Sequence, residues 1–249
     1  GAYIDWTYYL RNSRTLACGK IYMNKRTIMA FIWRIFYSMG IVLVRPMRYL
    51  GRNRHMKKAY WDYVRMSSLE LVAHEIYENN VIGEVAELGV YRGDFASIIN
   101  ALFPDRKLYL FDTFRGFCPN DVDIDRKENL SKGDQDFSKS SVELVLRKMQ
   151  YRDNVIIIEG HFPDSLVQIK GLENLLFAFV SIDVDLYLPT LSGLEFLYPR
   201  LSKGGFIFVH DYNNDMYRGV KRAVREFSYK NEVPFFFLSD ECGSAVIKK

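Results

Sequence analysis

Five apolar runs recur between residues 83 and 211, and most are separated by segments with helical spacing. Strands that are apolar along nearly their whole length are typical of a parallel sheet covered by helices on both faces. Right-handed crossovers then require a doubly wound arrangement. The sequence therefore predicts an α/β fold with strands at 83–90, 107–112, 154–160, 175–183 and 204–211.

Helical patterns fill the intervals between these strands. They are expected at 62–80, 93–103, 140–149, 190–201 and 217–227. Two further strands, at 233–239 and 244–249, follow without an intervening helix, which predicts an antiparallel strand at one edge of the sheet. The polar stretch at about 115–137 is interpreted as a long loop, a kind of segment that often serves as a lid.

Residues 1–60 differ from the rest of the chain and are interpreted as a basic, partly apolar helical arm, with the α/β domain at 61–249. The most apolar window of the arm, 28–44, runs for about 17 residues and contains Arg34, which puts it at the lower limit for crossing a bilayer. We expect residues 21–50 to pack on the core or on a second chain, with a homodimer interface favoured and peripheral contact to a membrane as a further alternative.

Charge and cysteine content narrow the choice of partner and compartment. The chain has 34 Lys and Arg against 30 Asp and Glu, and the two signs are mixed along most of its length, which does not favour a nucleic-acid partner. Cys18, Cys118 and Cys242 show no metal-ligand spacing and are odd in number, so we expect a reduced, cytoplasmic protein.

Acidic residues stand at the ends of all five central strands. Ligands of doubly wound sheets bind beyond the carboxyl ends of the strands, so these side chains should surround one site. Regular placement of this kind indicates that the site needs negative charge. The residues are Glu87, Asp112, Glu159, the pair Asp183 and Asp185, and Asp211 beside His210.

The first two strand ends indicate a nucleoside site. An acid at the end of the second strand, Asp112, can accept hydrogen bonds from both ribose hydroxyls. The glycines follow the spacing Gly89-x-x-x-Gly93, which lacks the pattern that seats a diphosphate. S-adenosylmethionine (SAM) fits this combination, with its amino-acid end near Glu87 to Ser97. The alternative is a tight strand–helix turn in which Asp94 caps the helix.

Several motifs together resemble the macrocin O-methyltransferase family of class I SAM-dependent enzymes. They include "VAELGVYRGDFAS", "LFDTFRGF", "VIIIEGHFPDSL" and "SIDVDLYLPTLSGLEFLYPRLSKGGFIFVHDY", and the resemblance extends from about residue 62 to 228. It implies a Rossmann-like, mostly parallel seven-stranded sheet, here with an N-terminal helical extension. It also implies methylation of hydroxyl groups of sugars or phenols on natural products, usually with Mg²⁺.

The resemblance implies a set of cofactor contacts as well. A helix preceding the domain lies over the methionine end of SAM in such enzymes, which suggests contacts from Met66 and Ser67. His161 is placed by analogy near the adenine, with a packing role as its alternative. The residues expected to contact SAM are Met66, Ser67, Glu87, Gly89, Tyr91, Gly93, Ser97, Asp112, Thr113, Phe114, Gly160, His161, Phe162 and Asp183.

Asp183, His210 and Asp211 are the expected catalytic and metal-binding residues. The family usually carries an acid where this chain has His210, and imidazole suits other divalent metals better than Mg²⁺, so the metal could be Mg²⁺ or another divalent ion. Asp183 is expected to act as a general base or as a metal ligand. His210 is a ligand, a base or a structural histidine, and Asp185 could instead cap the helix starting near Thr190.

These features favour a SAM-dependent O-methyltransferase that acts on a hydroxyl of a sugar or related polyol, in a small molecule or a glycan. One alternative is a methyltransferase for a phenolic or nitrogen acceptor. Another is an inactive, SAM-binding scaffold whose basic arm binds a partner. The acids at the ends of the fourth and fifth strands favour activity.

Overall fold

A computed structural model describes residues 32, 34–36, 38, 39 and 62–249. The expected arm at 1–60 lies almost entirely outside these residues, and so do the dimer and membrane contacts predicted for it. Its boundary with the α/β domain therefore stays a prediction. Within the described ranges, no helix combines the length and the apolar character that crossing a bilayer requires.

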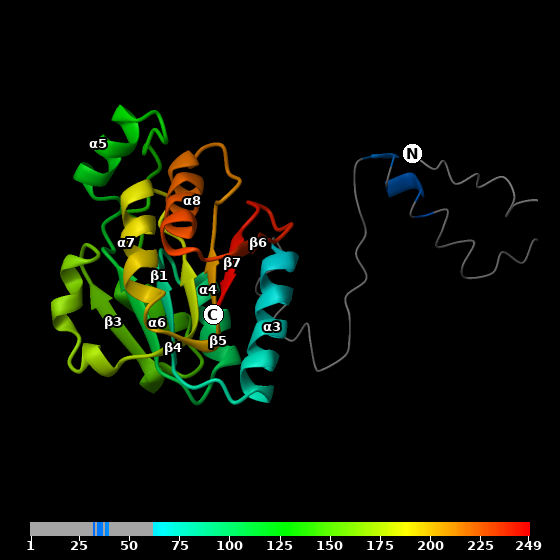
Figure 1. Ribbon diagram of the computed structural model, residues 1–249, viewed down its shortest axis with the longest axis vertical. Helices are drawn as coiled ribbons and strands as arrows, with labels where there is room; N and C mark the ends of the chain where they lie inside the picture. The colour runs from blue at the N-terminus through cyan, green and yellow to red at the C-terminus, as the bar shows by residue number, and fades with distance from the viewer. Residues whose placement is uncertain (1–31, 33, 37, 40–61) are drawn as a thin grey trace, which may run out of the picture. The chain divides into compact units, whose positions relative to one another are not determined.

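Seven strands form one sheet in the order β3-β2-β1-β4-β5-β7-β6 (Figure 1). Strands β1 to β5 are parallel, and β7 pairs antiparallel with both β5 and β6. The predicted doubly wound, mostly parallel sheet is confirmed, including its antiparallel strand. The strands are β1 Glu84–Leu88, β2 Leu108–Asp112, β3 Val155–Glu159, β4 Phe177–Ile182, β5 Leu201–Val209, β6 Phe235–Phe237 and β7 Ala245–Lys248.

Helices cover both faces of the sheet, and each face has its own apolar core. Residues of α3, α4 and α6 pack in one buried cluster, and residues of α7 and α8 pack in the other. Alternate residues of a strand enter opposite clusters, as Val85 and Ala86 of β1 do, which explains why the strands are apolar throughout. The helices are α3 Tyr63–Glu78, α4 Asp94–Leu102, α5 Pro119–Lys127, α6 Val142–Lys148, α7 Tyr187–Leu197 and α8 Arg218–Asn231.

The interpretation of 115–137 as one irregular loop is wrong, because α5 occupies its middle (Figure 1). This helix begins with Pro119 in its first turn, where a missing N–H costs nothing. The residues that it buries are Asp121, Val122 and Asp125, two of which are acids. A helix that buries polar side chains lacks the apolar stripe by which sequence reasoning recognises helices.

Strand β4 ends at Ile182, so Asp183, Val184 and Asp185 form a turn beyond the strand. Asp185 has a positive φ of 63°, and α7 begins at Tyr187, with Leu186 as N-cap and no side-chain cap bond. The predicted start of this helix near Thr190 is therefore wrong. Asp185 does not have the capping role that we considered for it.

The strand order reverses between β1 and β4, and ligands of doubly wound sheets bind at such a switch point. The two strand ends approach each other closely there. Gly89 has a φ of +85°, and a Cβ atom on it would lie 1.9 Å from the carbonyl oxygen of Asp183. Only glycine allows this approach, so Gly89 sets the distance between the two sides of the site.

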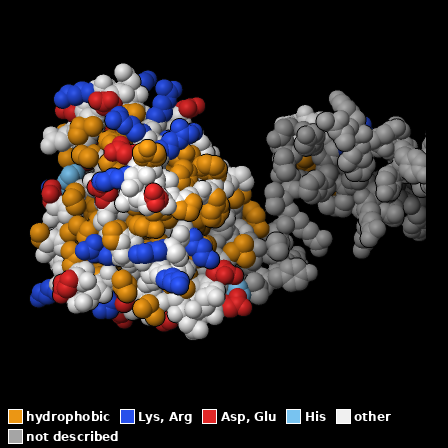
Figure 2. All heavy atoms as spheres, viewed as in Figure 1, with side chains coloured by type: hydrophobic (Ala, Val, Ile, Leu, Met, Phe, Trp, Pro, Cys, Tyr) orange, Lys and Arg blue, Asp and Glu red, His pale blue; other side chains and the backbone are white. Residues whose placement is uncertain are grey.

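Basic and acidic side chains are interspersed on the face of the domain that Figure 2 shows. Hydrophobic side chains lie between them in small groups. This face therefore shows the mixed charge pattern that the sequence predicts.

Candidate active site

A cavity of about 440 Å³ lies beyond the carboxyl ends of the parallel strands. This volume is within the range of small-molecule sites. The cavity brings together most of the residues that the sequence singles out, from α3, β1, β2 and the segments after β2, β3, β4 and β5. Those that line it are Met66, Glu87, Gly89, Tyr91, Asp112, Thr113, Gly160, His161, Phe162, Asp183, His210 and Asp211.

Four expected contact residues do not line the cavity, and three of these have visible structural tasks. Gly93 is the N-cap of α4, with a φ of 75°. The Ser97 hydroxyl donates to the carbonyl of Asp94 within the same helix. The backbone N–H of Phe114 donates to Asp112. The fourth, Ser67, is buried in α3.

Glu87, near the end of β1, is a buried acid beside the cavity. It is 1% exposed, and among the described residues its Oε2 has no hydrogen-bond partner. Burial raises the pKa of Glu87 well above its usual value. A buried carboxyl oxygen without a hydrogen bond is costly, and a cationic ligand group in the cavity would supply the missing donor. The methionine ammonium of SAM is a group of that kind.

Asp112, at the end of β2, holds the turn after β1 in place. Its Oδ2 accepts hydrogen bonds from the backbone N–H groups of Val90 and Tyr91 at 2.7 and 2.8 Å. Its Oδ1 accepts one from Phe114 at 2.7 Å. A carboxylate oxygen accepts about two hydrogen bonds, so Oδ1 retains acceptor capacity for a ribose hydroxyl. The expected two-oxygen contact with ribose is thus restricted to one oxygen in this arrangement.

Arg65 is the principal site residue that sequence reasoning missed. It lies on α3, 7% exposed, with Nη1 3.0 Å from Asp183 Oδ2 and Nη2 3.1 Å from the Ser181 hydroxyl. Its guanidinium also stacks over the Phe95 ring at 3.9 Å. The signal was the position of Arg65 directly before Met66, in the helix expected to cover the site. The sequence shows nothing of its partner, 118 residues away.

His210 links the two acids that were expected to accompany it. Its Nδ1 lies 3.1 Å from Asp183 Oδ1 and 3.0 Å from Asp211 Oδ2. Burial and the charge of Arg65 lower the pKa of His210, but the two carboxylates raise it, to about 12 in balance. Burial opposes ionisation of Asp183, yet the charges of His210 and Arg65 hold its pKa below the usual value. His210 therefore lies between two carboxylates that favour its charged form.

Asp185 joins the same group, although it was not among the expected metal ligands. Oxygens of Asp183, Asp185 and Asp211 lie within 4.8 Å of one another. Burial, the charge of Asp183 and a hydrogen bond with Asp211 raise the pKa of Asp185 well above its usual value. Three carboxylates at this spacing fit a hard divalent cation such as Mg²⁺. His210 instead groups with Asp211 and Cys242.

A family profile described as macrocin-O-methyltransferase (TylF) matches residues 56–237. The chain is 28% identical over 172 residues to a tetracenomycin-C 4'-O-methyltransferase of Streptomyces olivaceus, whose full name specifies an 8-demethyl-8-(2,3-dimethoxy-alpha-L-rhamnosyl) compound. This match covers 65% of each protein, just under two thirds. The chain is also 29% identical over 176 residues to a mycinamicin III 3''-O-methyltransferase of Micromonospora griseorubida. This second match covers 66% of the chain and 67% of that relative.

Among solved structures, the chain is similar to the calicheamicin methyltransferase CalS11. The TM-score is 0.59 at 20% sequence identity, over 94% of this chain and 99% of that one. At this level of identity the similarity concerns the fold, which is the doubly wound sheet described above.

Proposed function

This chain belongs to the macrocin O-methyltransferase family, and we propose that it transfers the methyl group of SAM to a hydroxyl group of a sugar or related polyol. The observation that carries the proposal is that one cavity contains both a set of residues suited to SAM and a set of acids suited to a hydroxyl acceptor. Glu87 and Asp112 offer acceptors for a nucleoside with an ammonium group, and Asp183, Asp185 and Asp211 line the same cavity. A relative whose name specifies a rhamnosyl compound supports a sugar as the acceptor.

The cofactor half of the cavity has the properties that SAM requires. The free oxygen of Glu87 supplies a partner for the methionine ammonium. Asp112 supplies an acceptor for ribose, and Tyr91, Gly160 and Phe162 line the space beyond it. The sulfonium of SAM makes the methyl group reactive by itself, so the main task of the protein is to align it with the acceptor oxygen.

In the acceptor half, we propose that Asp183, Asp185 and Asp211 hold a divalent cation, with Mg²⁺ favoured by the all-oxygen donor set. Such an ion polarises a bound hydroxyl and lowers its pKa. The charges of His210 and Arg65 favour ionised Asp183, which either expected role of Asp183, ligand or base, requires. His210 positions Asp183 and Asp211 through its two contacts.

The test is S-adenosylhomocysteine formation with a panel of acceptors: a nucleotide-linked deoxysugar, a glycosylated macrolide and a catechol. We expect turnover with a sugar acceptor and little with the catechol. Turnover with the catechol alone would contradict the sugar assignment, and no turnover with any acceptor of the panel, despite SAM binding, would favour a scaffold.

Asp112→Ala is the matching binding control. We expect SAM affinity in isothermal titration to fall about ten- to a hundred-fold, since a charge-assisted hydrogen bond and the turn after β1 are both lost. Unchanged affinity in the folded variant would remove Asp112 from the SAM site.

A further inference from the structure

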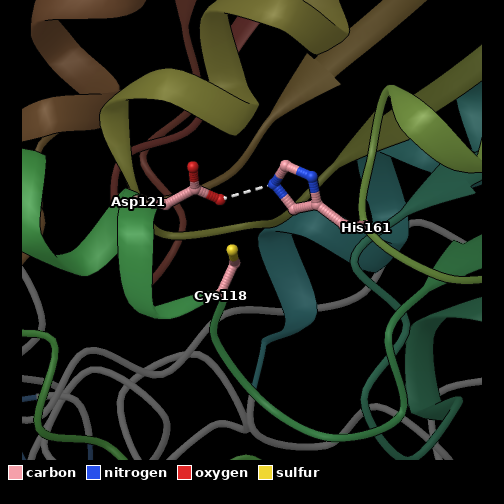
Figure 3. A group of neighbouring side chains, drawn as sticks. All are labelled: Cys118, Asp121 and His161. Atoms are coloured by element: carbon pink, nitrogen blue, oxygen red, sulfur yellow. Dashed lines mark hydrogen bonds and ion pairs between the residues drawn. The ribbon is translucent and has the colours of Figure 1, made fainter.

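A second group of potential metal ligands, made of other residues than the three-carboxylate cluster, lies in the wall of the same cavity. Cys118 and Asp121 come from the start of α5, and His161 follows β3 (Figure 3). The potential ligand atoms of these three residues all lie within 4.8 Å of one another. Cys118 and Asp121 are three residues apart at a helix start, so their side chains project from the same side.

The two ring nitrogens of His161 have separate carboxylate partners. Nε2 lies 2.9 Å from Oδ2 of Asp121, whose side chain is 5% exposed, and Nδ1 lies 3.0 Å from Oδ2 of Asp164, which is 83% exposed. Metal-binding histidines commonly donate their second ring N–H to a carboxylate, which fixes the tautomer and the ring orientation. Asp164 makes this contact and leaves Nε2 directed at Asp121 and Cys118.

We propose that Cys118, Asp121 and His161 form a binding site for zinc. Thiolate, carboxylate and imidazole are the three ligand types of protein zinc sites, whereas a thiolate does not suit Mg²⁺. Ligand atoms around a tetrahedral zinc stand roughly 3.3–3.6 Å apart, given bond lengths of about 2.0–2.3 Å. Small side-chain movements within the observed 4.8 Å therefore produce the required spacing.

The site has structural and chemical consequences. All three residues line the cavity, so a fourth ligand can come from water or from a molecule bound there. Zinc would tie the start of α5 to the segment after β3, two parts of the wall now joined at this point by the His161–Asp121 contact. This proposal does not depend on the methyltransferase activity, because zinc binding by these three side chains can be measured without turnover.

Cobalt titration of the full chain, freed of metal beforehand, tests the site. Co²⁺ replaces zinc, and a thiolate ligand adds a charge-transfer band in the near ultraviolet. We expect this band at one equivalent of cobalt, its displacement by one equivalent of zinc, and its loss in Cys118→Ser. The matched control is Cys242→Ser, because Cys242 also lies near a histidine and an aspartate, and this variant should retain the band.

A band that persists in Cys118→Ser, or no band in the unmodified protein, would overturn the proposal. Asp164→Ala provides a second measurement that does not touch a ligand. Loss of such a supporting carboxylate should weaken zinc affinity about ten- to a hundred-fold in competition with a chelator. Unchanged affinity would show that His161 is not held for metal binding.

Discussion

Arg65 concentrates several contacts in one buried side chain. It pairs with Asp183, donates to Ser181 and stacks on Phe95. Removing Arg65 leaves Asp183 with His210 as a charged neighbour but takes away its guanidinium partner in a region of low polarity. Arg65 therefore supports both the packing of α3 on the sheet and the ionised state of Asp183.

We predict that Arg65→Met lowers the free energy of unfolding by about 3–5 kcal/mol in urea denaturation. The control is Arg218→Met, which breaks an exposed pair with Asp215 at 4.0 Å. This loss should cost at most about 1 kcal/mol, because water screens an exposed pair. Equal effects of the two substitutions would contradict a structural role for the Arg65–Asp183 pair.

At the scale of elements, the ends of β1 and β4 create the site by their close approach. Gly89 and Gly171 both have positive φ, +85° and +71°, so alanine meets similar backbone strain at either position. Only at Gly89 would the new Cβ clash, at 1.9 Å from the Asp183 carbonyl oxygen, whereas around Gly171 no described atom lies within 4 Å. Comparing alanine substitutions at Gly89 and Gly171 therefore separates the effect of backbone strain from the effect of the distance between β1 and β4.

We predict that Gly171→Ala costs about 1–2 kcal/mol of unfolding free energy and leaves SAM affinity unchanged. Gly89→Ala should cost about 1–3 kcal/mol more, since the strand ends must move apart, and it should weaken SAM binding. Isothermal titration and denaturation of both variants provide the comparison. Intact SAM affinity in Gly89→Ala would show that the spacing of β1 and β4 does not govern the cofactor site.

At the scale of the whole molecule, the proposed assignment places cofactor and acceptor chemistry at different strand ends. The residues proposed to contact SAM come mainly from β1, β2 and the segment after β3, and the three acids proposed to hold a cation follow β4 and β5. Substitution of these three acids should therefore reduce turnover much more than it reduces SAM affinity. This separation makes the two proposals testable independently.

We predict that EDTA abolishes turnover, that Mg²⁺ or Mn²⁺ restores it, and that SAM affinity changes little. Asp183→Ala and Asp211→Ala should each reduce turnover at least about a hundred-fold, the low end for loss of a positioned acid–base or electrophilic group. Full activity in EDTA, combined with a severe defect in His210→Ala, would contradict the metal proposal. That result would assign the base role to His210.

The order of apolar runs and the acids at their ends were sufficient to predict the doubly wound sheet and the place of its cavity. Strands covered on both faces must be apolar along their length, so their signal is local. Parallel strands bring their carboxyl ends to one edge, so Glu87, Asp112, Asp183 and Asp211 could be placed together without coordinates.

Tertiary structure alone decided the features that depend on contacts between distant residues. Helix α5 was missed because its buried side includes Asp121 and Asp125, which look like loop residues in a sequence. The partners of Arg65 and His161 lie 118 and 40 residues away. A polar side chain is stable in a buried position only when the fold brings a partner to it, and no local pattern records which partner that is.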